Sequence, residues 1–202
     1  MSKELPPDID PETRCRLPMP DRSVLTGAAA EIYDQHVAGT SQSLKGLHGP
    51  GGIRLHSPNL AEVARPYARY LRFESGLSGD LRELTILIAA READSNFEWS
   101  AHENEARKEG LPEETIEAIR TGGPIDELPD RDAVLIRLGR EVLSTHKVSS
   151  ETYRAAHDLF GTRMLIDIVA LMGVYTSTAA ILACFDMQLP EGEVPRLPPL
   201  EK

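Results

Sequence analysis

The sequence predicts an all-α fold, and three observations support this prediction. Between residues 22 and 189, apolar residues recur three and four positions apart, the spacing of helices with one buried face. No segment sustains the alternation of apolar and polar residues that marks a half-buried strand. Capping residues and glycines divide the chain into segments of ordinary helix length. We therefore expect a single helical domain over residues 22–189.

Proline-rich segments flank this domain at both ends. Residues 1–21 contain five prolines, and residues 190–202 contain four. Proline has no backbone amide hydrogen and disfavours helix in the residue before it. We therefore expect an extended N-terminal arm over residues 1–21 and a C-terminal tail over residues 190–202.

The first half of the domain contains three expected helices. An apolar stripe predicts a helix over residues 22–37, whereas the glycine-rich stretch 46–52 indicates a loop. Ser57 is an expected N-cap, with Pro58 in the first position of a helix that reaches residue 73. Asp80 opens the next helix, and a glutamate three residues later completes a capping-box pattern.

The second half contains five more expected helices, over residues 96–109, 112–120, 130–143, 149–160 and 162–185. Gly110 ends the first of them, and Gly161 separates the last two. Residues 168–185 contain no charged side chain and are almost long enough to span a membrane. No basic cluster or second apolar segment accompanies them, so a buried core helix or a subunit interface is the preferred interpretation.

The charge balance restricts the expected partners. The chain has 32 acidic and 22 basic residues and a formal net charge of −10. A nucleic-acid binder needs a basic face that displaces counterions from phosphates, and a protein that binds an anionic membrane surface also needs a basic face. We therefore expect neither partner, although a few local arginines can still bind a small anionic substrate.

The cysteines and the N-terminus indicate a cytoplasmic protein. Cys15 and Cys184 lie far apart and form neither a Cys-x-x-Cys pair nor a metal-ligand spacing, so we expect two free thiols. The sequence from Met1 to Pro7 lacks the apolar stretch of a signal peptide.

One group of side chains has the composition of a proton-transfer site. Glu98 and His102 are four positions apart on an expected helix and share a face, and Glu83 lies on the preceding helix. Simpler interpretations exist: Glu83 as a capping-box acid, and Glu98 with His102 as a surface ion pair. Two ligands do not make a stable metal site, so we expect no metal.

The run from Leu81 to Gly122 resembles the carboxymuconolactone decarboxylase family, a branch of the alkylhydroperoxidase D (AhpD)-like superfamily. The resemblance lies in the Arg82-Glu83-Leu84 start, the apolar body, the Glu-Trp-x-x-His core and the Ala-Arg-Lys-Glu-Gly-Leu turn. Segments 145–149, 159–161 and 185–190 resemble longer family members. The resemblance implies an AhpD-like helical bundle that assembles as a homotrimer or homohexamer.

The peroxidase branch of this superfamily has a glutamate, a Cys-x-x-Cys pair and then a histidine. The matching positions here are Glu83, Ser95, Glu98 and His102, so both thiols are missing. Thiol peroxidase chemistry needs one thiolate to attack and a second to resolve, which disfavours that activity here. The glutamates and the histidine still permit acid–base chemistry without a cofactor.

The resemblance implies a carboxy-lyase that acts on a small carboxylated lactone or a similar intermediate of aromatic catabolism. In our hypothesis His102 donates the proton, Glu98 fixes its tautomer, and Glu83 completes the relay. The alternatives are an isomerase, hydratase or lactone-opening enzyme on the same scaffold, or a non-catalytic oligomeric protein. The candidates for binding the carboxylate substrate are Trp99, Arg72, Arg82, Arg91, Tyr70 and His146.

Overall fold

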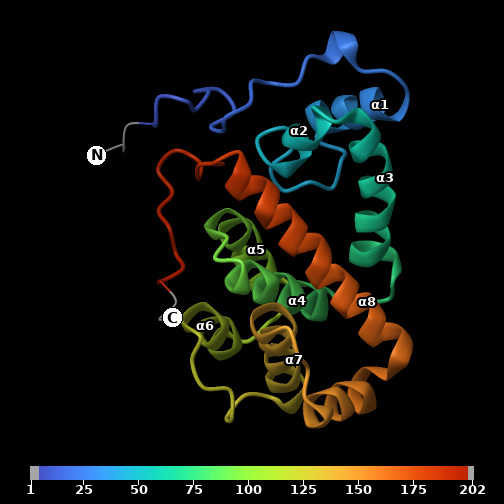
Figure 1. Cartoon of the computed structure of the whole chain (residues 1–202), viewed down its shortest axis with the longest axis vertical. Coiled ribbons are helices and arrows are strands. Elements are labelled where there is room, and N and C mark those ends of the chain that lie inside the picture. Colours follow the sequence, from blue (N-terminus) through green and yellow to red (C-terminus); the bar gives the residue numbers. More distant parts are fainter. Residues whose placement is uncertain (1–4, 200–202) are drawn as a thin grey trace. The chain divides into compact units, whose positions relative to one another are not determined.

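The computed structural model describes residues 5–199, and within this range it contains helices but no strand (Figure 1), as predicted. Two wider, π-helical turns, Tyr70–Glu74 and Glu141–Thr145, extend the third and seventh helices, and a short 3₁₀ turn covers Arg22–Val24. The α-helices are α1 (Gly27–Val37), α2 (Pro50–Leu55), α3 (Pro58–Arg69), α4 (Gly79–Glu92), α5 (Asn96–Lys108), α6 (Glu113–Thr121), α7 (Asp130–Arg140) and α8 (Ser150–Cys184).

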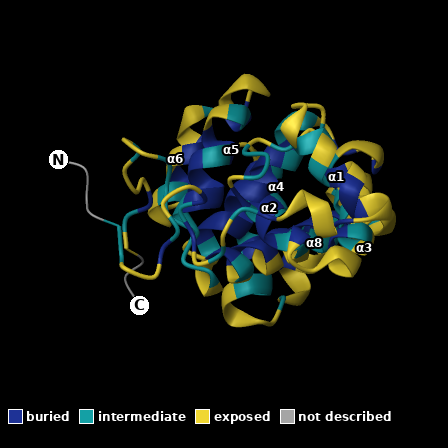
Figure 2. Ribbon diagram, turned by 90° about the horizontal axis from the view of Figure 1, so that it is seen from above, coloured by how far each residue is buried: buried dark blue, intermediate teal, exposed yellow. Residues whose placement is uncertain are grey.

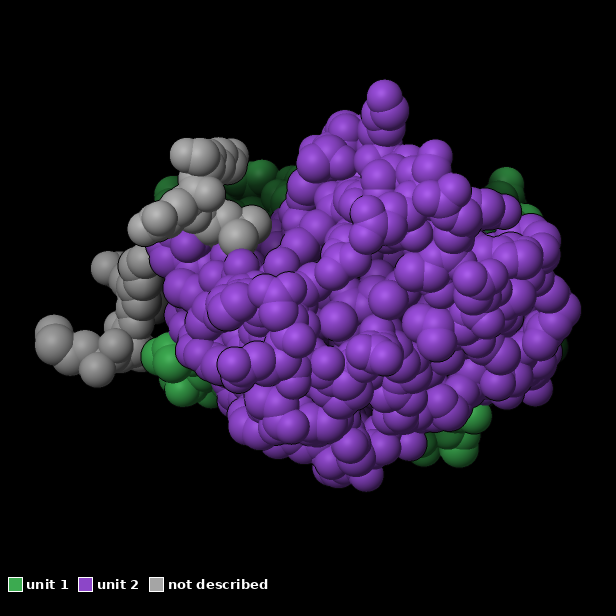
Figure 3. All heavy atoms as spheres, turned by 90° about the horizontal axis from the view of Figure 1, so that it is seen from below, with its two compact units in different colours: residues 1–68, 180–194 green, residues 69–179, 195–202 purple. Residues whose placement is uncertain are grey.

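The described chain divides into two compact units (Figure 3). The first contains the residues up to Ala68 together with Ala180–Val194. The second contains Arg69–Ala179 together with the chain from Pro195. The single domain expected over residues 22–189 stays a prediction, and residues 1–4 of the arm and 200–202 of the tail lie outside the described residues.

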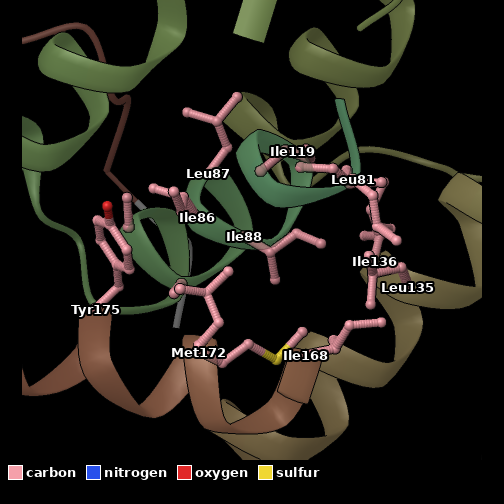
Figure 4. Packing of buried hydrophobic residues seen from close by; sticks show 14 of the residues in the cluster. Leu81, Ile86, Leu87, Ile88, Ile119, Leu135, Ile136, Ile168, Met172 and Tyr175 are labelled. Atoms are coloured by element: carbon pink, nitrogen blue, oxygen red, sulfur yellow. The ribbon is translucent and has the colours of Figure 1, made fainter. Parts of the chain in front are cut away.

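Helix α4 forms the centre of the second unit and contacts α5, α6 and α7. Every residue from Glu83 to Arg91 is buried, because the helix body has apolar side chains on all sides (Figure 2). The side chain of Ile88 lies among those of Ile136 in α7 and Met172 in α8 (Figure 4). The buried helix therefore holds the other helices of this unit around itself.

The first unit has a smaller core, formed by residues of α1, α2 and α3. Here the loop expected over residues 46–52 is wrong in its second half, because α2 begins at Pro50. A Cβ atom added at Gly52 would clash with the carbonyl group of Leu47. The glycines therefore allow a close approach between backbones, and they do not keep this stretch out of a helix.

The N-terminal segment contains no helix between residues 5 and 21, as predicted. It is paired with the segment that follows α8. The Arg16 amide donates to the carbonyl of Phe185 at 2.9 Å, and the Gln188 amide donates to the carbonyl of Arg14 at 2.9 Å. Cys15 is buried, Cys184 is exposed, and both are free thiols as predicted.

The long apolar helix expected at the C-terminal end is α8, and a left-handed Gly161 interrupts it where the sequence predicted a break. By length and composition, α8 is the one helix among residues 5–199 that could cross a membrane. Half of its most apolar window is nevertheless buried inside the protein, as in the core helix of a globular domain. The cytoplasmic location remains a prediction.

Candidate active site

Helices α4 and α5 place a glutamate and a histidine in direct contact. The connection between them is short, with Asp94 in the left-handed conformation (φ 49°), so the two helices form a hairpin. His102 Nδ1 lies 2.7 Å from Glu83 Oε2. Both side chains are buried, with 4% and 2% of their respective residue surfaces exposed. The contact is therefore a short, charge-assisted hydrogen bond in a dry environment.

Glu83 is fixed from its other side by the neighbouring Arg82. Arg82 Nε donates to Glu83 Oε1 at 3.0 Å, and the same guanidinium donates to Glu109 at 2.9 Å. Burial raises the pKa of Glu83, but the hydrogen bonds from His102 and Arg82 outweigh it, and the net pKa lies below its usual value. Glu83 is thus an ionised acceptor that receives the Nδ1 proton of His102.

The second carboxylate stands on the opposite side of the imidazole. Glu98 Oε2 lies 3.8 Å from His102 Nε2, and Glu98 is 4% exposed. With Nδ1 committed to Glu83, Nε2 is the ring nitrogen that can exchange a proton with a bound molecule. Glu98 is the nearest carboxylate recorded beside that nitrogen among the described residues.

Two of the simpler interpretations are wrong, because Glu83 is not a capping-box acid and the Glu98–His102 pair is not on the surface. Helix α4 begins at Gly79, and Glu83 points into the protein. The positions of the two glutamates also differ from our hypothesis. Glu83, rather than Glu98, makes the hydrogen bond that sets the tautomer of His102, because the packing of the hairpin turns Nδ1 toward α4.

Tyr175 packs against the candidate site, although no sequence pattern singled it out. Its ring meets the ring of His102 edge to face, with centroids 5.1 Å apart. Burial raises the pKa of its hydroxyl well above the usual value, so the phenol stays protonated. A single tyrosine in an apolar helix is usually a core residue, and only the packing of α8 identifies this one.

The three candidate arginines have different surroundings. Arg82 is engaged by Glu83 and Glu109. Arg91 is 1% exposed and contacts Asp94 at 3.4 Å, eight residues further along α4 than Glu83. Arg72 stacks on the ring of Phe73, with its guanidinium carbon 4.6 Å from the ring centroid, and has no carboxylate partner among residues 5–199.

The other substrate-binding candidates have different contacts of their own. Trp99 has no exposed surface and lies in the apolar core. The hydroxyl of Tyr70 lies 3.4 Å from the carboxylate oxygens of Asp167. His146 is exposed, in the left-handed conformation, and contacts the carbonyl of Val142. Among the described residues, no three His, Cys, Asp or Glu side chains are grouped in a way that suits a metal ion.

Together these features define an all-helical protein with a buried imidazole between two carboxylates. Residues 58–129 match the model of the carboxymuconolactone decarboxylase family. A solved structure from Agrobacterium tumefaciens, a protein of unknown function proposed to be the antioxidant defence protein AhpD, shares the fold. It has a TM-score of 0.61 and 19% identity, over 68% of this chain and 94% of that one. The search of curated proteins found no match.

Residues 58–129 are therefore similar to the carboxymuconolactone decarboxylase family, and the chain shares its fold with the Agrobacterium structure.

Proposed function

We propose that the protein is a carboxy-lyase that acts on a small carboxylated lactone or a similar intermediate of aromatic catabolism. The observation that carries this proposal is the 2.7 Å contact between His102 Nδ1 and Glu83, which leaves Nε2 for substrate. A buried imidazole held by an ionised carboxylate is a competent general acid–base pair.

In the proposed reaction the bond between the carboxylate carbon and the ring system breaks, and CO₂ leaves. The electron pair passes into the conjugated lactone. His102 Nε2 then delivers a proton to the carbon that carries the negative charge, and Glu83 holds the ring in place during this transfer. Glu98 lies where it can return a proton from solvent to Nε2, so the histidine is ready for another turnover.

The site supports acid–base chemistry over thiol chemistry. Ser95 and Glu98 occupy the two positions that carry thiols in the peroxidase branch. A serine hydroxyl and a carboxylate cannot form the disulfide on which thiol peroxidase turnover depends. The antioxidant role proposed for the Agrobacterium protein is therefore not transferred to this chain.

To test this proposal, the purified protein is incubated with 4-carboxymuconolactone and with related lactone acids. Substrate absorbance and released CO₂ are measured together. We expect CO₂ release together with loss of absorbance. In His102→Ala we expect kcat/KM to fall by about 10²–10⁴-fold, the usual contribution of a general acid. The matched control is His157→Ala, since His157 is a partly exposed histidine of α8 that contacts Thr162 and Asp158.

The two measurements separate the alternatives. A change in absorbance without CO₂ would show isomerisation, hydration or ring opening at the same acid–base site and would contradict decarboxylation. Full turnover by His102→Ala would remove the histidine from the mechanism. No reaction with any lactone acid would overturn the proposal and favour a non-catalytic role.

A further inference from the structure

Arg72 has an unpaired hydrogen-bond donor inside the protein. Its Nε atom is buried and has no hydrogen-bond partner within the described residues. A buried guanidinium N–H without an acceptor is costly, and most such donors in folded proteins are paired. The Arg72 guanidinium stacks on the ring of Phe73 and has no ion-pair partner among residues 5–199. An acceptor supplied by a ligand would satisfy this donor.

The same phenyl ring links Arg72 to the acid–base centre. The Arg72 and Arg82 guanidinium carbons lie 4.6 Å and 5.5 Å from the Phe73 ring centroid. Arg82 also donates to the backbone carbonyl of Arg72 at 3.4 Å, and it holds Glu83. Arg72 is therefore a direct neighbour of the arginine that fixes Glu83.

Tyr175 completes the connection from the side of α8. Its ring packs against that of His102, and burial raises the pKa of its hydroxyl, with smaller contributions from the charges of Arg72, which lowers it, and Glu98, which raises it. Arg72 thus offers an unpaired donor next to the arginine that holds Glu83, and Tyr175 offers a hydroxyl on the ring that packs against the imidazole.

The charges near the imidazole explain why an anionic substrate needs an additional cation at this site. Glu83 is ionised, and Arg82 divides its charge between Glu83 and Glu109. A carboxylate that approached His102 would meet negative charge unless another cation were available. Arg72 neighbours Arg82 across the Phe73 ring and has no carboxylate partner among residues 5–199, so it is the candidate for that cation. Its planar guanidinium can pair with a carboxylate through two parallel hydrogen bonds.

We propose that the Arg72 guanidinium and the Tyr175 hydroxyl form the binding seat for a carboxylate group of the substrate. The inference deepens the proposed function, on which it rests, by naming the residues that recognise the substrate. A binding seat of this kind makes the site selective for a free carboxylate over the corresponding ester, because an ester carries no charge for Arg72 to pair with.

The test is a binding measurement that does not depend on turnover. Isothermal titration calorimetry compares (5-oxo-2,5-dihydrofuran-2-yl)acetate with its methyl ester, in the wild type and in His102→Gln. We expect the acid to bind at least about tenfold more tightly than the ester. Arg72→Gln should weaken binding of the acid by about tenfold or more and leave the ester unchanged, and Tyr175→Phe should weaken it by about threefold.

The matched control is Arg69→Gln, because Arg69 is an exposed arginine of the same helical segment and pairs with Glu74. This variant should bind the acid like the wild type. Should Arg72→Gln fail to fold, Arg72→Lys keeps the charge but loses the planar fork, and we expect it to retain only part of the preference for the acid.

Three results would overturn the inference: equal binding of acid and ester by the wild type, undiminished binding of the acid by Arg72→Gln, or no binding of the lactone acid, acetate or benzoate at millimolar concentration. These results are distinguishable from failure of the proposed function. Turnover by His102→Ala contradicts the acid–base mechanism even if Arg72 selects carboxylates, whereas loss of selectivity leaves the role of His102 intact.

Discussion

At the scale of single residues, Glu83 is held by two donors of different kinds. An imidazole nitrogen contacts one carboxylate oxygen at 2.7 Å, and a guanidinium nitrogen contacts the other at 3.0 Å. Both contacts favour the ionised carboxylate, so protonating Glu83 would weaken both of them. The stability of the fold and the state of the imidazole are therefore coupled through this one side chain.

This coupling predicts a pH-dependent effect of Glu83→Gln. The pKa of Glu83 in the folded protein lies below its ordinary value of 4.5, so its contribution to stability is fully present above that pH and is lost as the pH falls through the folded pKa. At pH 7 we expect the substitution to lower the free energy of unfolding by about 2–4 kcal/mol. Urea unfolding at several pH values measures the difference, which should shrink below about pH 4.5.

The control for this experiment is Glu114→Gln, which alters an exposed carboxylate in α6. Its difference from the wild type should stay small at every pH. A Glu83→Gln difference that stays constant down to pH 3 would contradict the ionised state assigned to Glu83.

The sequence was sufficient to select Glu83, Glu98 and His102, because their spacing and the family resemblance both depend on local information. It could not show which carboxylate contacts Nδ1, since that depends on how α4 and α5 are rotated against each other. Nor could it separate Arg72 from Arg82 and Arg91, because local spacing does not show which side chains are buried or which distant carboxylates, such as the Glu109 that Arg82 contacts, lie beside each guanidinium. Tyr175 is 73 positions away from His102, and only tertiary packing brings the two rings together.

At the scale of helices, the close packing of α4 depends on small residues in its neighbours. Gly139 of α7 faces Ile88, and a Cβ atom added there would overlap with the side-chain methyl of Ile88 and lie 3.5 Å from Met172 Cε. Gly173 of α8, in contrast, has no atom within 4 Å of such a Cβ. Packing therefore requires a residue without a side chain at position 139, whereas position 173 has room for one.

This difference predicts opposite effects of the same substitution. Gly139→Ala should lower the free energy of unfolding by about 1–2 kcal/mol, because overpacking of the core exceeds the gain in helix propensity. Gly173→Ala should leave it unchanged or raise it by up to about 1 kcal/mol. Thermal and urea unfolding of both variants measure the effects, and equal stability of the two would contradict the packing described around Ile88.

The boundaries of most helices could be predicted from the sequence, because caps, prolines and glycines act locally. Ser149 illustrates this, since its hydroxyl accepts the amide of Thr152 at 3.1 Å at the start of α8, as an N-cap does. One exception is the helix expected over residues 22–37, where a 3₁₀ turn is followed by extended residues and α1 begins only at Gly27. Another is α2, where the glycines indicated a loop. Their use in a close backbone contact with Leu47 depends on tertiary structure and leaves no local signal.

At the scale of the whole molecule, α8 carries apolar surface that the described chain does not cover. Half of its most apolar window is unburied, and Ile166 exposes 62% of its surface. Exposed apolar residues on a long helix are typical of subunit interfaces. This is the physical reason behind the proposed homotrimer or homohexamer.

Light scattering coupled to size exclusion tests this assembly. We expect a mass three or six times that of the 22.2 kDa chain, and Ile166→Glu should shift the mass toward that of one chain. The control is Val24→Glu, since Val24 is 71% exposed but lies outside α8. A wild-type protein that runs as a monomer would contradict the assembly.

The hairpin of α4 and α5 also has a consequence for the order in which the protein forms. Glu83 and His102 are separated by only 19 positions, and Glu98 lies between them. Short loops close faster and at lower entropic cost than long ones, so this contact can form early in folding. On the ribosome, the residues of the α4–α5 hairpin are synthesised before those of α8. The residues of the His102–Glu83 pair are thus separate in sequence from the helix that contributes Tyr175, and we expect substitutions in α8 to change the proposed carboxylate seat without removing the pair.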